Sequence, residues 1–193
     1  MGELINGKWV KKNIARIDNK GNFDRRASVF RDHINNDSKF LPEKDRYHLY
    51  VSLACPWAHR TLIYRKLKSL EGYITVDIVH PDMLDNGWMF DESFHDATNE
   101  RYYQSKYLYE IYQKSDPCAD TKVTVPILWD KKNETIVNNE SSEIIRMFNT
   151  SFNHLTNNTN DYYPQKYQKE INLINDFVYK NINNGVYKSG FAT

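Results

Sequence analysis

The sequence has few cysteines and no long apolar run, and each shortage excludes a class of protein. Only 2 of its 193 residues are cysteine, which is too few for a disulfide framework or for a zinc site built on thiolates. The mean hydropathy is −0.75, and no stretch reaches the apolar length that a membrane-spanning helix requires. We therefore expect neither a disulfide-stabilised fold nor a membrane protein.

An excess of charge of one sign is also missing. The 26 Lys and Arg residues are nearly balanced by 25 Asp and Glu residues, so the formal net charge is +1. The basic residues are scattered rather than gathered in a stripe, which argues against nucleic acid as a partner. The first residues lack the apolar segment of a secretory signal, and we expect a cytoplasmic protein.

The chain begins with a polar stretch and then shows the pattern of a strand, a helix and a second strand. Residues 1–45 are polar and charged, which predicts an irregular N-terminal arm. The two phenylalanines of segment 23–31 either pin this arm to a neighbouring domain or belong to a surface leader with a few anchors, and composition favours the leader. Apolar and polar residues alternate over 46–53 and again over 74–78, and helical spacing lies between them. A strand–helix–strand unit of this kind predicts two parallel strands.

The remaining elements complete a thioredoxin-like α/β domain, which we place at 46–150. A tyrosine-rich helix is predicted over 102–112, a strand containing a proline over 123–129, a hairpin strand over 135–137, and a helix capped by Asn139. The predicted order is therefore β-α-β, α, β-β-α. Residues 151–193 are expected to hold a linker rich in Asn and Thr and one more helix, over 167–182.

Cys55 is the candidate nucleophile because it stands between the first strand and its helix. A cysteine reacts as the thiolate, whereas a free thiol with a pKa of about 8.5 is mostly protonated at neutral pH. A helix N-terminus supplies unpaired N–H groups and partial positive charge that favour the anion, and Pro56 suits the first helical position. We expect Cys55 to cap the helix with its sulfur toward the N–H groups of Trp57 and Ala58.

The residues around Cys55 favour chemistry with a single thiol. Ala58 occupies the place of the second cysteine of a dithiol oxidoreductase, so no disulfide can close within this turn. A mixed disulfide on Cys55 needs an external thiol to release it, which indicates glutathione-dependent chemistry. His59 and Arg60 add positive charge nearby. The other cysteine, Cys118, has no such context and is expected to be an ordinary loop residue.

Three further features suit a peptide-like thiol ligand, and each also has a purely structural interpretation. Val125-Pro126 is either an edge-strand proline or a cis turn that leaves the Val125 backbone free to pair with a ligand. Glu140 and Ser141 stand at a helix start, where N–H groups hold a carboxylate and Glu140 an ammonium, although a plain helix cap has the same sequence. Trp88 is either a core anchor or the aromatic wall of a pocket.

Together, these motifs closely resemble those of the glutathionyl-hydroquinone reductases, the xi-class glutathione transferases related to the omega class. The resemblance covers about 45–193, and segment 23–31 is similar to the N-terminal arm of that family. It implies a thioredoxin-like glutathione transferase N-terminal domain followed by the beginning of an all-helical domain. The motifs are Cys55-Pro56-Trp57-Ala58-His59-Arg60, Gly87-Trp88-Met89-Phe90, Val123-Thr124-Val125-Pro126, Asn139-Glu140-Ser141 and Gly185-Val186-Tyr187-Lys188-Ser189-Gly190-Phe191-Ala192.

The resemblance implies a reaction that uses glutathione as cosubstrate and needs no metal and no nucleotide. The Cys55 thiolate would attack the sulfur of a glutathionyl-hydroquinone, and Tyr187 would face the quinol and help to protonate the departing aromatic carbon. The products would be a free hydroquinone and a Cys55–glutathione mixed disulfide. A second glutathione would then give oxidised glutathione and restore Cys55.

The same resemblance implies a set of glutathione contacts. Val125 would pair with the glutathione backbone, and Glu140 with Ser141 would hold the γ-glutamyl end. Lys122 stands where the family usually has arginine, so a single charge would replace a two-pronged contact to a carboxylate. The implied glutathione-binding residues are Trp88, Lys122, Val125, Pro126, Glu140 and Ser141.

The sequence covers only part of the length of family members, and its function has alternatives. Members of the family continue into an all-helical domain that completes the substrate pocket and carries dimer contacts, whereas this sequence ends as that domain begins. We expect a chain that lacks most of this domain, so that a family-type homodimer would lack those contacts. Two other functions fit the same residues: an omega-like thiol transferase or dehydroascorbate reductase, which would not require Tyr187, and a glutathione-binding module without turnover.

Overall fold

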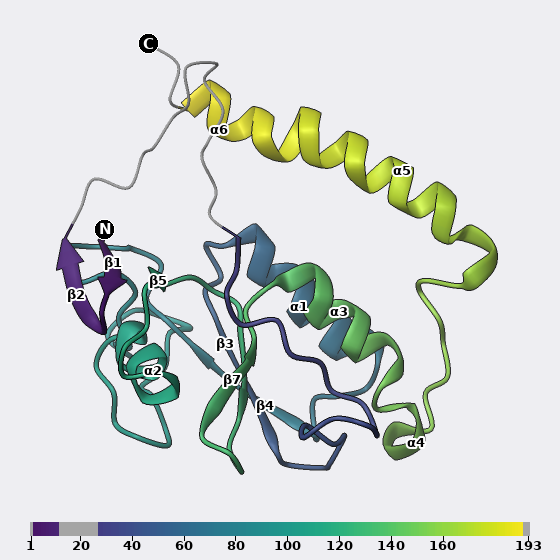
Figure 1. Ribbon diagram of the computed structural model, residues 1–193, viewed down its shortest axis with the longest axis horizontal. Coiled ribbons are helices and arrows are strands. Elements are labelled where there is room, and N and C mark those ends of the chain that lie inside the picture. The colour runs from purple at the N-terminus through teal and green to yellow at the C-terminus, as the bar shows by residue number, and fades with distance from the viewer. Residues whose placement is uncertain (1, 12–26, 191–193) are drawn as a thin grey trace. The chain divides into compact units, whose positions relative to one another are not determined.

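The computed structural model describes residues 2–11 and 27–190 (Figure 1). These fall into two compact units, of which one contains residues 2–11 and 28–160 and the other contains residues 161–190. Residues 23–26 of the predicted arm motif and residues 191–193 lie outside the described residues. The predicted boundary after residue 150 differs from this division, which keeps 151–160 with the first unit.

A four-stranded sheet forms the centre of the first unit. Its strands are β3 (Tyr47–Val51), β4 (Ile74–Ile78), β6 (Ile127–Asp130) and β7 (Thr135–Asn138), in the order β4-β3-β6-β7. Strand β4 pairs with β3 in parallel, whereas β6 runs antiparallel to both β3 and β7. The parallel pair and the following hairpin were both predicted, and both are confirmed.

Three helices cover this sheet. Helix α1 (Pro56–Leu67) and helix α3 (Ser141–Thr150) lie side by side on one face, and α2 (Leu108–Ser115) lies on the other (Figure 1). Helix α3 begins after Glu140, which accepts a hydrogen bond from the Ser142 N–H at 3.2 Å. The N-cap is therefore Glu140, one residue later than the Asn139 that the sequence predicted.

The tyrosine-rich helix predicted over 102–112 is wrong in its first half. The N–H groups of Tyr102 and Tyr103 donate to the Glu100 carboxylate at 3.0 and 2.6 Å, so this carboxylate holds a turn instead of a helix. The helix begins only at Leu108, where Tyr107 and Glu110 form a capping box. A buried carboxylate that gathers nearby N–H groups therefore overrode the helical periodicity.

Residues 2–11 form a hairpin where the sequence predicted an irregular arm, and for these residues the prediction is wrong. Strands β1 (Gly2–Ile5) and β2 (Lys8–Lys11) join β5 (Thr121–Lys122) in a second sheet of order β2-β1-β5. Asn6 and Gly7 make the turn with φ of 47° and 73°, the conformation that an Asn-Gly pair adopts readily. A Cβ on Gly7 would lie 1.8 Å from the Pro117 carbonyl oxygen, so this turn also needs the close approach that glycine allows.

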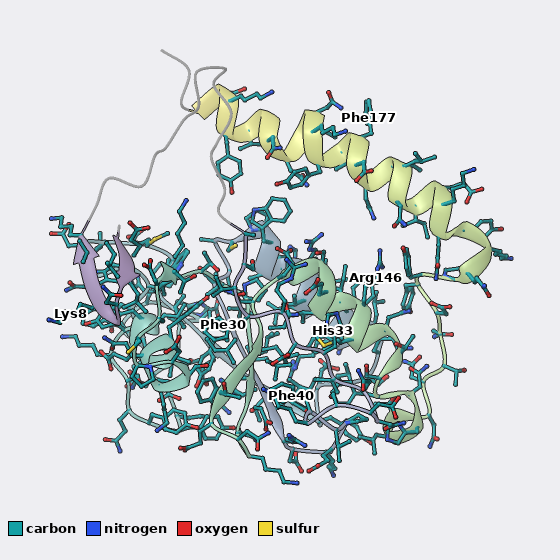
Figure 2. The ribbon with its side chains drawn as sticks, viewed as in Figure 1. Lys8, Phe30, His33, Phe40, Arg146 and Phe177 are labelled. Atoms are coloured by element: carbon teal, nitrogen blue, oxygen red, sulfur yellow. The ribbon has the colours of Figure 1, made fainter. Side chains whose placement is uncertain are left out.

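The segment after residue 27 packs along the outer edge of the sheet, beside β7 and α3. Phe30, His33 and Phe40 all come from this segment (Figure 2). The Phe30 carbonyl accepts from the Asn139 N–H at 3.1 Å, and the Asp32 N–H donates to Val137 at 3.0 Å. The anchoring of the arm by a phenylalanine is therefore seen at Phe30, which packs against the core.

The second unit is one helical run with two local changes of pitch. A 3₁₀ turn (Gln165–Tyr167) leads into α5 (Gln168–Val178), a π-helical turn (Tyr179–Asn183) and α6 (Asn184–Gly190). The helix predicted over 167–182 is thus confirmed and continues to Gly190. Several of its large apolar side chains are exposed, among them Leu173, Ile174 and Phe177; Figure 2 labels Phe177. A short helix, α4 (Asn153–Thr156), lies in the predicted linker.

His48 on β3 is buried within a charged network on the sheet. Its Nδ1 atom lies 2.7 Å from Thr75 Oγ1, and its Nε2 atom lies 3.4 Å from Asp77 Oδ2. Asp77 also accepts from the Arg101 side chain at 2.6 Å and from the Arg101 N–H at 3.1 Å. Burial lowers the pKa of His48. Burial opposes the charge on Asp77, but the contacts with His48 and Arg101 outweigh it and lower the pKa of Asp77 as well.

We expect the chain to lose stability as the pH falls below 6.5, the ordinary pKa of histidine. In that window the unfolded chain binds a proton that the folded chain, with His48 held neutral, does not bind. The free energy of unfolding then falls by at most about 1.4 kcal/mol per pH unit for this proton. Because the pKa of Asp77 is lowered from 3.8, Asp77 adds to the loss only at more acidic pH. Urea unfolding between about pH 7 and about pH 5 measures the slope.

Two histidine variants identify the source of this slope. The His95 side chain is 92% exposed, so His95→Gln should keep the wild-type slope. His48→Gln should flatten it, whatever its effect on stability at neutral pH. An unchanged slope in His48→Gln would show that another group causes the pH dependence.

Candidate functional site

Cys55 begins helix α1, as predicted. It is the N-cap residue, followed by Pro56, and its carbonyl accepts the His59 N–H at 3.0 Å. Its own N–H donates to the Ser52 carbonyl at 3.1 Å. Both backbone groups of Cys55 are therefore hydrogen-bonded, one to the loop after β3 and one to α1. The thiol is half-buried, whereas Cys118 is exposed in a turn, as expected for a loop residue.

The direction of the sulfur differs from the prediction. Cys55 makes no side-chain capping hydrogen bond to the described N–H groups of α1. Its Sγ atom lies instead 3.8 Å from the Val125 carbonyl oxygen. A protonated thiol can donate to a carbonyl, whereas a thiolate can only accept. Loss of the proton therefore removes this contact and leaves the helix N–H groups as the favourable neighbours of the sulfur.

The turn at Val125-Pro126 contains a cis peptide bond, which decides between the two interpretations of this proline. Val125 precedes β6, and its N–H donates to no acceptor among the described residues. The carbonyl of the same residue faces the Cys55 sulfur. An extended backbone could thus pair with Val125 directly beside the thiol.

Tyr112 connects the residue before Val125 to the loop between β7 and α3. Its hydroxyl donates to the Thr124 carbonyl at 3.0 Å and accepts from the Thr124 N–H at 3.2 Å and from Asn139 Nδ2 at 3.0 Å. Tyr112 is fully buried on α2, and burial raises its pKa. One buried hydroxyl therefore holds the strand leading to Val125 against the residue that precedes Glu140.

Glu140 and Ser141 stand at the start of α3, where a carboxylate and an ammonium could be held. Arg60 on α1 donates to Ser141 Oγ through Nε at 2.9 Å and through Nη2 at 2.7 Å. The Nη2 atom also lies 3.7 Å from Glu140 Oε1, and Ser28 donates to Glu140 Oε2 at 3.3 Å. The start of α3 is therefore tied to the helix that carries Cys55.

Sequence reasoning left the directions of these partners open or missed them. The sequence indicates a positive charge at Arg60, but the direction of this side chain follows only once α1 and α3 are packed together. The spacing of Trp57 and Arg60, one helical turn apart, could have indicated that they are neighbours. Ser28 could not be found in this way, because 112 residues separate it from Glu140 along the chain.

Trp88 and Lys122 lie on other parts of the first unit. Trp88 is only 8% exposed and belongs to the core, and its carbonyl accepts the Leu108 N–H that begins α2. This is the core-anchor interpretation of Trp88, and its contact with glutathione stays a prediction. Lys122 lies in β5 opposite Glu3 of β1, three residues before Val125. Its predicted contact with a carboxylate also stays a prediction.

Tyr187 lies in α6 of the second unit. The structure therefore brings Cys55, Val125 and Pro126 together, and connects them through Arg60 to Glu140 and Ser141. The role of Tyr187 stays a prediction that rests on the family resemblance.

Comparison with known proteins identifies the family. The family model described as "Glutathione S-transferase, N-terminal domain" matches residues 54–151, the part of the chain that contains Cys55, Val125 and Glu140. The chain belongs to the glutathione S-transferase family. The resemblance found in the sequence and the thioredoxin-like fold that it implied are both confirmed.

Individual members of the glutathione S-transferase family are similar to this chain over most or all of its length. Glutathionyl-hydroquinone reductase YqjG of Escherichia coli is 54% identical over 201 residues, covering 100% of this chain and 61% of the relative. Glutathione S-transferase omega-like 2 of Schizosaccharomyces pombe is 53% identical, covering 90% of this chain and 56% of the relative. The glutathione-bound structure of E. coli YqjG has a TM-score of 0.87 and 52% identity, covering 100% of this chain and 59% of that one.

The chain thus spans about three fifths of the length of these relatives. Across residues 2–11 and 27–190, no helix is long and apolar enough to cross a membrane. The same described residues contain no group of three or more His, Cys, Asp or Glu side chains arranged to hold a metal ion.

Removing the Tyr112 hydroxyl should destabilise the first unit. In Tyr112→Phe, Asn139 Nδ2 and the backbone of Thr124 lose a buried partner, and we expect the free energy of unfolding to fall by about 1–3 kcal/mol. Tyr109→Phe is the matched control on α2, because the Tyr109 hydroxyl makes no hydrogen bond to a described residue. Urea unfolding measures both variants, and equal losses would contradict the connecting role of Tyr112.

Proposed function

We propose that this chain removes glutathione from glutathionyl-hydroquinones by means of Cys55. The observation that carries the proposal is the position of the Cys55 thiol, at the start of α1 and 3.8 Å from the carbonyl of Val125. The relatives named as glutathionyl-hydroquinone reductase and omega-like transferase support glutathione chemistry for the chain. The E. coli relative that binds glutathione in its solved structure supports the ligand.

In the proposed complex, the glutathionyl group lies along the turn of the cis proline. The Val125 N–H and carbonyl pair with its backbone, and the start of α3 receives its γ-glutamyl end. Ser141 and the N–H groups of α3 suit the carboxylate of that end, and Glu140 suits its ammonium. Trp88 and Lys122 are the proposed further contacts, at the wall of the site and at a second carboxylate.

The first chemical step forms one sulfur–sulfur bond and breaks one carbon–sulfur bond. The Cys55 thiolate attacks the glutathionyl sulfur, and the electron pair of the broken bond stays on the aromatic carbon. That carbon takes up a proton, with Tyr187 as the proposed donor, and the product is a free hydroquinone. Cys55 is left in a mixed disulfide with glutathione.

The second step restores the enzyme. The thiolate of another glutathione attacks the sulfur of the mixed disulfide, which yields oxidised glutathione and the Cys55 thiolate. The overall reaction converts one glutathionyl-hydroquinone and one glutathione into one hydroquinone and one oxidised glutathione. The carbon–sulfur bond is reduced, and the two glutathione sulfurs are oxidised to the disulfide.

An omega-like thiol transferase is the second candidate, because one relative carries that name. This activity uses the same Cys55 mixed disulfide but needs no proton donor for a carbon. The rates on a glutathionyl-hydroquinone and on a small mixed disulfide of glutathione distinguish the two functions. A high rate on the disulfide alone would favour the transferase.

Replacing the nucleophile should abolish turnover. We expect Cys55→Ala to release hydroquinone from a glutathionyl-hydroquinone only at the rate measured without protein, because no thiolate attacks the sulfur. Chromatography of the released hydroquinone measures the rate, and intact mass reveals a glutathione adduct on the wild-type chain. Cys118→Ala, at the exposed loop cysteine, should keep both release and adduct. An adduct without release would support the transferase, and neither adduct nor release would leave a binding module.

Replacing the proposed proton donor should separate the two activities. We expect Tyr187→Phe to slow hydroquinone release by about a hundredfold, the usual effect of losing a general acid. The rate on a small mixed disulfide should not change, since no carbon is protonated there. Tyr167→Phe is the control, because Tyr167 precedes α5 and is 52% exposed. A parallel loss of both rates in Tyr187→Phe would contradict the role of proton donor.

A further inference from the structure

Arg60 contacts both the ring of Trp57 and the first residues of α3. The Arg60 guanidinium carbon lies 5.2 Å from the Trp57 ring centroid. Two nitrogens of the same group donate to Ser141 Oγ at 2.9 and 2.7 Å, and one of them lies 3.7 Å from Glu140. Cys55 at the start of α1 therefore supplies the thiol, and Arg60, five residues later, supplies a cation that contacts the start of α3.

The two donations from Arg60 determine what the Ser141 hydroxyl can do. A hydroxyl accepts through two lone pairs and donates through one hydrogen. Both lone pairs of Ser141 Oγ are used by Arg60, so only the hydrogen remains for another partner. Ser141 is 2% exposed, and no described residue accepts this hydrogen. The hydroxyl is thereby fixed as a donor.

The positive charge of Arg60 beside the N-terminus of α3 also favours binding of an anion there. A cation at a helix N-terminus is unfavourable, because the helix dipole is positive there. Glu140 offsets part of this charge, but its two carboxylate oxygens are shared with Ser142 and Ser28. A ligand carboxylate at Ser141 would meet the positive helix end, the Arg60 charge and a hydroxyl hydrogen in one place.

We propose that Arg60 is a positioning residue for the α-carboxylate of the γ-glutamyl group. It fixes Ser141 as the donor to that carboxylate and supplies positive charge behind it. This inference rests on the proposed function, since it requires the glutathionyl group to bind at the start of α3. It adds a specificity-determining residue to that site.

Binding measurements on single and double variants test the connection. Isothermal titration with S-methylglutathione, which cannot form a disulfide, gives the dissociation constant for the wild type and each variant. We expect Arg60→Gln and Ser141→Ala each to weaken binding about tenfold, as for the loss of a hydrogen bond to a charged group. Because both act on one contact, the double variant should bind about as well as Ser141→Ala alone.

Two ligand analogues separate recognition of the carboxylate from a general structural effect. S-methylated 4-aminobutyryl-cysteinylglycine lacks the α-carboxylate, and S-methylated glutaryl-cysteinylglycine lacks the α-amino group. Arg60→Gln should not weaken binding of the first analogue any further, whereas it should weaken binding of the second analogue about tenfold, as for S-methylglutathione. Equal losses with all three ligands would overturn the proposal, because a merely structural Arg60 would affect every ligand alike.

Two further variants, a conservative one and a control, complete the test. Arg60→Lys keeps the charge but donates less directionally, so it should recover part of the lost affinity. Lys66→Gln removes another cation from α1, one whose side chain is 74% exposed and pairs with Glu71, and should leave binding unchanged. Thermal unfolding followed by circular dichroism verifies that each variant is folded. Wild-type binding with no loss in Arg60→Gln overturns this inference alone, whereas no wild-type binding overturns the proposed function as well.

Discussion

The position of β6 between β3 and β7 fixes where the functional loops lie. Strand β6 runs against both neighbours, and its first residue, Ile127, pairs with Tyr50 near the end of β3. The next residue, Leu128, pairs with Asn138 at the end of β7. The loop after β3, the turn before β6 and the loop after β7 must therefore meet at one end of the sheet. Cys55, Val125 and Glu140 belong to these three loops.

Buried hydrogen bonds then set the distances within this cluster of loops. Tyr112 connects the backbone before Val125 to Asn139, and the Asn138 side chain accepts the Glu140 N–H at 2.7 Å. At the opposite end of β6, Arg46 donates to Asp130 through two nitrogens at 2.9 and 2.6 Å, with both side chains buried. Each end of β6 is thus fixed by paired polar groups, and burying such groups is favourable only when their partners are in place.

The sequence predicted well what depends on local pattern. The strands β3 and β4, the helix that begins at Pro56 and the hairpin of β6 and β7 follow from alternation, helical spacing and turn residues. The Asn6-Gly7 turn has an equally local signal, an Asn-Gly pair, but it lies in a polar stretch whose composition predicts an irregular arm. Glu100 overrode the helical pattern of 102–107 through hydrogen bonds that no periodicity contains. Contacts such as Ser28 with Glu140 depend on how distant segments pack, so they appear only in the folded chain.

The candidate site shows the same division between local and distant signals. The place of Cys55 follows from its sequence neighbours, whereas the sequence left the Val125-Pro126 bond open between two interpretations and only the structure shows it to be cis. The direction of the sulfur could not be predicted either, because the Val125 carbonyl lies 70 residues away along the chain. Trp88 was left open between two interpretations, and its 8% exposure places it in the core. Glu140 was expected beside the cap and is itself the cap, since Asn139 uses its amide to bind Tyr112.

A single-thiol mechanism explains why the helix that carries the nucleophile should be tied to the proposed recognition site at the start of α3. In the proposed reaction the glutathionyl group remains on Cys55 between the two steps, so its γ-glutamyl end must stay bound while its sulfur changes partner. Cys55 begins α1, which is a rigid element on the scale of these contacts. Arg60, on the second turn of the same helix, donates to Ser141 at the start of α3. The distance from the nucleophile to the proposed carboxylate site therefore stays constant through both steps. A recognition group on a separate mobile loop would not provide this constancy.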